Sequence, residues 1–318
     1  MLIQLPCCRL APAVSLTGEI CRLIMFKKIV VVGIVLSLSG AVRADYVAER
    51  RAAVAQGYAG KHVEALTAYT NMAANATSEF QKSDALELAA KCANGLKQYD
   101  RALELAKQIP LAAVSKKCRM YLLLRNRKNK ELINEFKTED IEHWPASEGV
   151  IGYGLYYRGS AYFKLKNGQA AETDLKKATG YNRDTRIQGR LWCTLGDNYR
   201  GNLKDDQKAL EAYAPAIKMI RNGTDAYWLL SVISSSAILR KQGKYDKALQ
   251  MLGKVDMSKI KGVWLSNVLC AYGETLAGQG KKAEALAEFN KALGVKGVSD
   301  AQKKNYEKKI KELQGDVK

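Results

Sequence analysis

Residues able to carry out acid–base or metal chemistry are few along this chain of 318 residues. Two histidines occur, His62 and His143, which is too few for most histidine-based metal sites and acid–base enzymes. His62 takes a position that Tyr99 and Tyr245 take in similar strings, so we interpret it as a packing residue. His143 has acidic neighbours and lies beside Trp144, and we interpret it as a structural loop residue.

Two glycine-rich strings resemble nucleotide-binding loops but lack residues that such loops need. In the string 278–282, Lys282 stands where a phosphate loop has the Ser or Thr that holds the metal, and residue 275 is Thr rather than Gly. The glycines between residues 149 and 159 follow no predicted strand and are wrongly spaced for a dinucleotide. We therefore predict no cofactor.

Motifs of hydrolytic enzymes are also missing from the sequence, which contains neither Gly-x-Ser-x-Gly nor His-Glu-x-x-His. Glycan-cleaving enzymes can work with two carboxylates alone, but no pair of acids is singled out by its pattern. Four cysteines follow residue 44, none in a Cys-x-x-Cys motif: Cys92, Cys118, Cys193 and Cys270. A Cys92–Cys118 disulfide and buried free thiols both remain open. We predict no catalytic residue and no metal site.

Residues 25–44 have the three parts of a secretory signal peptide. A basic start from Met25 is followed by an apolar run over 29–42, and Ala44 ends a small-residue cleavage site before Asp45. The run is shorter than the roughly 20 residues that span a bilayer, and no cysteine follows it for a lipid anchor. We interpret residues 1–24 as an extension upstream of the true start, with an unusually long n-region as the alternative. The mature chain is then expected to lack a transmembrane anchor.

The charge of the chain is strongly basic, with a formal net charge of +19. Residues 1–44 hold five of the 51 basic residues and one of the 32 acidic ones, so the remainder carries +15. In an exported protein this favours anionic surfaces over nucleic acid, because the nucleic acid is in another compartment. An acidic protein, an anionic polysaccharide and a lipid surface are the candidate partners.

An internal repeat determines the predicted fold. The string at 243–249, Gly-Lys-Tyr-Asp-Lys-Ala-Leu, returns with variations, and its alanine is spaced by 37, 69, 38, 39 and 37 residues. The interval of 69 holds one further, degenerate unit centred on Leu132 and Phe136. The anchoring alanines are Ala65, Ala102, Ala171, Ala209, Ala248 and Ala285.

Each unit has the apolar spacing of two helices around a tight turn. In residues 155–178, Leu155, Gly159 and Tyr162 share a face of the first helix, and Ala171 and Leu175 share a face of the second. Small residues at Gly159 and Ala171 indicate that the two helix backbones cross closely there.

This pattern resembles the tetratricopeptide repeat family over residues 46–293. The resemblance is most specific in 152–181 and 189–218, where aromatic, Leu, Gly and Tyr residues all fall at family positions. It is weaker in the first three units, and the period exceeds the family's 34 residues. The resemblance implies an all-α, right-handed α-solenoid of about seven hairpins over 45–297.

A final helix over 298–318 is expected to cap the solenoid. Ser299 and Gln302 have the spacing of a capping box, and Tyr306, Ile310 and Leu313 form one apolar stripe. A solenoid needs a half-polar terminal helix to cover its last apolar face. We interpret the lysines of this helix as a solvated face: Lys303, Lys304, Lys308, Lys309 and Lys311.

The resemblance also implies a binding groove, because certain first-helix positions of the family line its concave side. Those positions combine aromatic rings with an excess of bases. The alternative is that the tyrosines belong to the core and the bases only solubilise. The asparagines of the family's dicarboxylate clamp are missing. The groove positions are Lys117, Tyr121, Arg125, Tyr153, Tyr156, Phe163, Lys164, Arg190, Asp197, Arg200, Arg240 and Lys241.

From these patterns we expect an exported scaffold, periplasmic or extracellular, that binds another macromolecule in its groove. A protein partner with an acidic surface is the first candidate. The alternative is an enzyme, or a subunit of one, that acts on acidic cell-surface glycan through carboxylates in the groove.

The leader pattern makes a direct prediction about the processed N-terminus. Translation should start at Met25, and the exported chain should begin at Asp45, because the basic, apolar and small-residue segments follow in order. N-terminal sequencing of the native protein measures this. A mature protein that retains residues 29–42 would contradict it.

Overall fold

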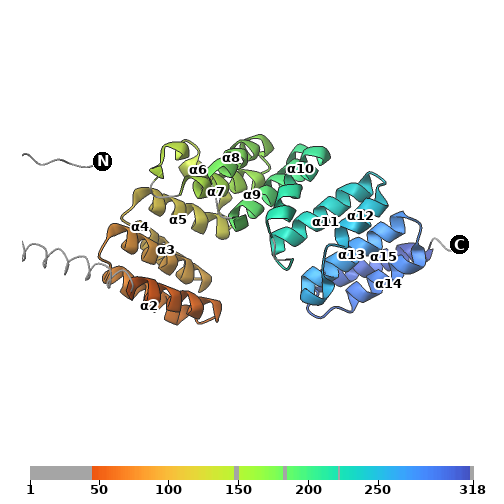
Figure 1. The fold of residues 1–318 in the computed structure, drawn as a ribbon, viewed down its shortest axis with the longest axis horizontal. Coiled ribbons are helices and arrows are strands. Elements are labelled where there is room, and N and C mark those ends of the chain that lie inside the picture. The colour runs from red at the N-terminus through yellow and green to blue at the C-terminus, as the bar shows by residue number, and fades with distance from the viewer. Residues whose placement is uncertain (1–44, 147–149, 182–184, 221–222, 316–318) are drawn as a thin grey trace, which may run out of the picture. The chain divides into compact units, whose positions relative to one another are not determined.

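The computed structural model describes residues 45–146, 150–181, 185–220 and 223–315, and every regular element in these ranges is a helix (Figure 1). The predicted signal peptide and the extension before it lie outside the described residues. The chain divides into two compact units, Met1–Gln98 and Tyr99–Lys318. The predicted all-α class is confirmed. No helix in the described ranges has the length and apolarity needed to cross a membrane.

The first unit contains a helix over residues 45–58, then α2 (His62–Ala74) and α3 (Glu79–Gly95). Its helices pack through fully buried alanines such as Ala65 and Ala85. The first helix is held to α3 by Asp84, whose carboxylate accepts hydrogen bonds from the Tyr46 hydroxyl at 2.9 Å and from Arg50 Nε at 2.6 Å.

The second unit is a succession of helical hairpins followed by one terminal helix, and each hairpin packs against the next. It begins with α4 (Tyr99–Lys107), the partner of α3 in chain order. Counted in this order, the described residues contain the seven predicted helix pairs. The later helices are α5 (Ala112–Arg125), α6 (Asn129–Phe136), α7 (Ile151–Lys164), α8 (Gly168–Tyr181), α9 (Thr185–Asn198), α10 (Asp206–Met219), α11 (Ala226–Lys241), α12 (Tyr245–Leu252), α13 (Gly262–Gly278), α14 (Lys282–Leu293) and α15 (Asp300–Gly315). Short 3₁₀ turns lie at Ile141–His143 and Met257–Lys259.

The turn inside each hairpin has one residue in the left-handed conformation, and these residues give the true repeat period. In six of the seven turns, the residue after the left-handed one donates its backbone N–H to a carbonyl near the end of the first helix, at 2.9–3.0 Å. The bond from Asn167 to the Tyr162 carbonyl is an example, and its pattern is that of a Schellman motif. The interval from Lys97 to Arg127 is 30 residues, so the degenerate third unit is the short one. The left-handed residues are Gly60, Lys97, Arg127, Lys166, Lys204, Gly243 and Gly280.

The fifth hairpin departs from this turn because its first helix continues as a π-helix, Tyr199–Leu203. The amide of Asn198 donates to the Gly168 carbonyl at 2.8 Å, and the amide of Asn202 donates to the Phe163 carbonyl at 3.0 Å. These bonds attach the wider turn to the end of the preceding hairpin.

Close packing within a hairpin depends on a glycine in its first helix. A methyl group on Gly159 would lie 2.9 Å from Leu175 Cγ, and one on Gly196 would lie 2.5 Å from a ring carbon of Tyr213. The same contact joins Gly273 to Phe289. The predicted close approach at Gly159 is confirmed, and Ala171 is fully buried.

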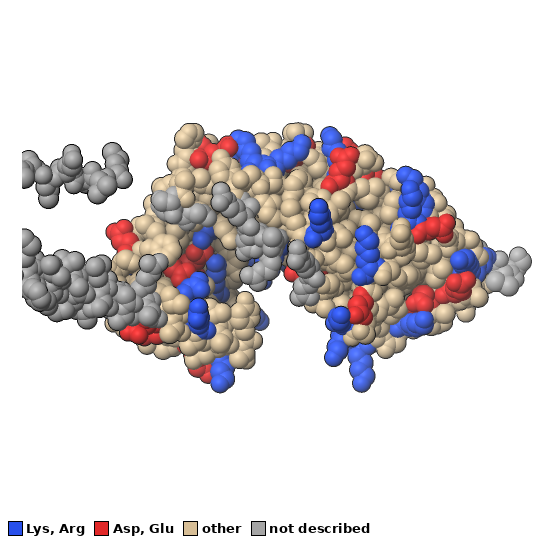
Figure 2. Space-filling view, in the orientation of Figure 1, with Lys and Arg blue, Asp and Glu red and all other residues tan. Residues whose placement is uncertain are grey.

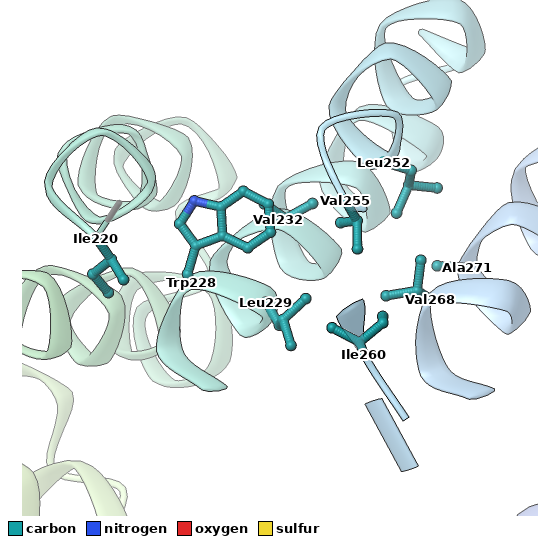
Figure 3. Packing of buried hydrophobic residues seen from close by; sticks show 9 residues of the cluster. All are labelled: Ile220, Trp228, Leu229, Val232, Leu252, Val255, Ile260, Val268 and Ala271. Carbon is teal, nitrogen blue, oxygen red and sulfur yellow. The ribbon is translucent and has the colours of Figure 1, made fainter. Parts of the chain in front are cut away.

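Apolar clusters fill the space between successive hairpins. Trp228 is central to one of them, and its indole N–H donates to the Ile217 carbonyl at 3.2 Å. Figure 3 shows this cluster, which joins α11, α12 and α13 through Ile220, Trp228, Leu229, Val232, Leu252, Val255, Ile260, Val268 and Ala271.

The terminal helix α15 has the predicted cap and covers the predicted face. Ser299 and Gln302 exchange backbone-to-side-chain bonds of 3.3 and 3.4 Å. Tyr306 is buried and donates to Ser266 Oγ at 3.2 Å, while Ile310 and Leu313 pack against a cluster of α13 and α14.

Filling the glycine contact should destabilise the fourth hairpin. We expect Gly159→Leu, and Ala171→Leu, to lower the free energy of unfolding by about 1–3 kcal/mol, because both sites have no room for larger side chains. Thermal or urea unfolding measures this. Gly180→Leu is the matched control, since a methyl on this exposed α8 residue would contact nothing within 4 Å. Equal midpoints for all three variants would refute the packing described here.

Candidate binding surface

The predicted groove residues lie on the first helices of four consecutive hairpins, or directly after them. These helices, α5, α7, α9 and α11, contact one another in that order. They carry two rows of side chains. One row lies in the N-terminal halves or near the middle of the helices and the other at their C-terminal ends.

The first row centres on four partly buried tyrosines, which we call the tyrosine cluster: Tyr121, Tyr153, Tyr156 and Tyr157. The ring of Tyr157 lies 5.9 Å from that of Tyr121, 6.3 Å from that of Tyr153 and 5.6 Å from that of Tyr156, between ring centroids. All three pairs are tilted by 45–59°. The sequence analysis missed Tyr157, although its spacing of four from Tyr153 places both on one helix face.

Basic side chains lie at both sides of the tyrosine cluster. The Lys117 ammonium is 5.5 Å from the centroid of Tyr153. The Arg190 guanidinium is 5.2 Å from the centroid of Tyr227, a second ring that the sequence analysis missed. Burial raises the pKa of Tyr156, and the nearby Tyr227 adds to the rise, so the phenol stays neutral.

The second row contains Phe163, Lys164, Asp197 and Arg200. The ammonium of Lys164 is 5.0 Å from the ring centroid of Phe163, and Arg200 is exposed. Asp197 has a structural role, because it accepts a 2.6 Å hydrogen bond from Tyr213, the ring that fills the space at Gly196. Burial raises the pKa of Asp197, and this hydrogen bond opposes the rise.

At the sixth hairpin the predicted groove bases have partners within the chain. Arg240 and Lys309 each lie 2.6 Å from Glu274, and Lys241 lies 2.6 Å from Asp206. The interpretation of Lys309 as a solvated lysine was therefore wrong, since it is 26% exposed and reaches back to α13. Figure 2 shows basic and acidic side chains next to one another over the visible face of α11–α14.

Four predicted bases have no acid within ion-pair distance in the described ranges. We call them the basic set: Arg125, Lys164, Arg190 and Arg200. Arg190 stands out because its Nε is buried and has no hydrogen-bond partner there. The rows of α5, α7 and α9 therefore combine aromatic rings with an excess of bases, although Asp197 is close enough to Arg200 and Lys164 for both to lower its pKa.

Cysteine chemistry is not favoured at this surface. Cys92, Cys118, Cys193 and Cys270 are free thiols, so Cys92 and Cys118 are not bridged. Burial raises the pKa of both Cys193 and Cys270 to about 12, which keeps them protonated and poorly nucleophilic. No group of three potential metal ligands occurs where the structure is described.

Comparisons with known proteins find similar solved structures but no related sequence. No family model matches the chain, and no curated protein matches its sequence. Its fold is similar to that of a tetratricopeptide repeat protein from Parabacteroides merdae ATCC 43184, with 17% identity, a TM-score of 0.48 and coverage of 85% of this chain and 98% of that one. It is also similar to the C-terminal part of a TPR repeat-containing protein from Cytophaga hutchinsonii, with 14% identity, a TM-score of 0.49 and coverage of 79% and 97%.

Removing Glu274, the acid of the seventh hairpin that Arg240 and Lys309 share, should loosen the terminal helix. Glu274→Ala leaves Arg240 and Lys309 facing each other without an acid. We expect faster amide exchange in α15 and a loss of about 1 kcal/mol in stability, because solvent screens these partly exposed charges. Hydrogen exchange measures the first effect and urea unfolding the second. Glu312→Ala removes only an exposed pair with Lys308 and should change neither. Unchanged exchange in α15 of the Glu274 variant would show that the triad does not hold this helix.

Proposed function

We propose that this chain is an exported scaffold that binds an acidic segment of another protein along α5, α7 and α9. One observation carries the proposal: the first helices that hold the tyrosine cluster also carry four bases, Arg125, Lys164, Arg190 and Arg200, that form no ion pair in the described ranges, and Arg190 Nε has no hydrogen-bond partner there. Rigid aromatic rings supply contact area at a low cost in side-chain entropy, and arginine pairs with carboxylates in a planar fork. Uncompensated bases beside such rings therefore favour an acidic partner.

The positions of the acids favour binding over glycan hydrolysis. Asp197 is engaged by Tyr213, and Glu274 is held by Arg240 and Lys309. Two-carboxylate hydrolysis needs one acid free to protonate the leaving group and another free for the sugar or a water. An acidic polysaccharide is kept as an outcome of the test.

Export is the second part of the proposal and rests on the leader pattern of residues 25–44. The mature charge of +15 would meet anionic partners in the cell envelope or outside it. A scaffold in that compartment would recognise envelope or secreted proteins.

Charge reversal in the basic set should abolish binding without unfolding the protein. Arg125 and Arg200 are exposed and form no ion pair with any described residue, so reversing both to Glu should weaken binding by about tenfold or more, with more loss at low salt than at high salt. Cross-linking to an envelope fraction recovers the partner, and titration with the purified partner gives the affinity. Released sugar from envelope polysaccharide is assayed in parallel.

The matched control reverses Lys304 and Lys311, two exposed lysines of α15. This double variant carries the same change in net charge and should bind nearly normally. Equal losses from both double variants would mean diffuse attraction to a basic protein. No loss from the Arg125 and Arg200 variant would place the interface elsewhere, and release of sugar would favour the glycan enzyme.

A further inference from the structure

The helix over residues 45–58 packs one of its faces inside the first unit. Tyr46 and Arg50 bond Asp84 of α3, and Ala53 is buried. These residues are spaced by four and three positions and therefore share one face of the helix. A position two residues further along lies about 200° around the axis, because 3.6 residues make one turn. The residues at such positions point away from this packing.

The outward face of this helix is apolar although it is exposed. Val47 is 39% exposed, Tyr58 is 85% exposed, and Val63 at the start of α2 is 61% exposed. Between Val47 and Tyr58 the face carries alanines and one charged residue, Arg51, whose long stem can lie along apolar surface. We call it the alanine face, and its exposed alanines are Ala48, Ala52, Ala55 and Ala59.

The terminal helix α15 shows what a solenoid helix without a further neighbour needs. Its outer side exposes charged side chains such as Lys304, Glu307 and Lys311. A terminal repeat with a polar outer face keeps a solenoid soluble. The alanine face lacks this polarity, and an exposed apolar surface of this kind marks a site of interaction.

The spacing of the alanines favours a second copy of the chain as the occupant. The four alanines are separated by four, three and four positions, so the pattern is the same in both directions. Two copies that cross antiparallel about a two-fold axis place Ala48 opposite Ala59 of the second copy, and Ala52 opposite its Ala55. Small side chains let two helix axes approach to about 8 Å. A two-fold interface uses the same patch on both subunits, which this pattern permits.

The charges at the two ends of the helix suit the antiparallel arrangement and oppose a parallel one. Glu49 lies near the N-terminal end and Lys61 follows the C-terminal end, and both are exposed without an ion pair to any described residue. In the antiparallel pair, Glu49 of one copy lies within about one helical turn of Lys61 of the other. The amino terminus created by processing offsets the charge of Asp45. A parallel pair would bring Glu49 to Glu49 and Lys61 to Lys61.

We propose that the exported chain forms a two-fold dimer in which the helices over residues 45–58 pack antiparallel through their alanine faces. Val47 and Tyr58 cover the edges of the contact, and Glu49 of each copy pairs with Lys61 of the other. The dimer goes beyond the proposed function, since it leaves α5, α7 and α9 free, and it rests on the expected processing that makes Asp45 the first residue.

The first experiment measures the oligomeric state of the chain that begins at Asp45. Sedimentation velocity from about 1 to about 100 μM chain should show monomer giving way to dimer, because one helix pair buries less area than a standard stable interface. Ala52→Lys and Ala55→Lys should each weaken the dimer by about tenfold or more, because the ammonium is buried beside Arg51 without an acid. Lysine is a good helix former, so the helix itself is preserved.

The matched control is Ala301→Lys, which adds the same charge at an exposed alanine of α15 and should leave the dimer unchanged. Thermal midpoints confirm that each variant is folded.

A charge exchange tests the orientation of the two copies. Glu49→Lys and Lys61→Glu should each weaken the dimer by about threefold to tenfold, and the double variant should recover the original affinity, because it restores opposite charges at both ends. In a parallel pair, like charges would face each other in every one of these variants, so neither loss nor recovery would appear.

Four results would overturn the dimer. These are a chain that stays monomeric over the whole range, a dimer that Ala55→Lys does not weaken, a double variant that fails to recover, and a monomeric native protein that retains residues before Asp45 to cover the alanine face. A native complex with a different protein that Ala55→Lys dissociates would assign the face to that protein and also exclude the dimer. The Arg125 and Arg200 reversal should leave the dimer intact, so failure of the dimer and failure of the proposed function are separate outcomes.

Discussion

The contact between a glycine of one helix and a large side chain of its partner is the constraint on which this structure depends. The two helix backbones of a hairpin approach closely where Gly196 meets Tyr213 and where Gly273 meets Phe289. Each contact also fixes the position of one helix along the axis of the other. Because protein interiors are close-packed, a contact without free space fixes both the distance between the helices and their relative rotation. The fourth, fifth and seventh hairpins share this contact, through Gly159, Gly196 and Gly273.

The turns fix how the two helices of each hairpin in the second unit are joined. Most of them close with the same bond pattern, so the second helix begins at the same place relative to the first even where Lys166 replaces a glycine at positive φ. The strain of a lysine in the left-handed conformation is about 1–2 kcal/mol, which the surrounding packing offsets. The short third unit is anchored differently. Arg158 pairs with Asp174 at 2.7 Å and donates to the carbonyls of Phe136 and Glu139, which ties its irregular end to the fourth hairpin.

Charge is distributed unevenly over the aligned first helices. At the C-terminal end of the second unit, Glu274 forms ion pairs with both Arg240 and Lys309, so these two bases already have an acid partner within the chain. Along α5, α7 and α9, Lys116, Arg119 and Arg158 are paired with acids, whereas Arg125, Lys164, Arg190 and Arg200 form no ion pair among the described residues. These four bases confine the proposed interface to three hairpins, although basic residues occur throughout the sequence.

The sequence by itself determined the helical class, the number of hairpins, the terminal cap and the close contact at Gly159, because these follow from spacings of three and four residues and from local backbone chemistry. The sequence also assigned most residues of the candidate binding surface to the helices on which they lie. Only the tertiary structure decided which bases are paired. Arg240 meets Glu274 and Lys309 across 34 and 69 positions of the chain, and no local pattern encodes such distances. Tyr227 was missed for the same reason, because its contact is with the guanidinium of Arg190 on a neighbouring helix. Tyr157 could have been found from its spacing of four from Tyr153, but its contact with Tyr121 depends on the packing of α5 against α7.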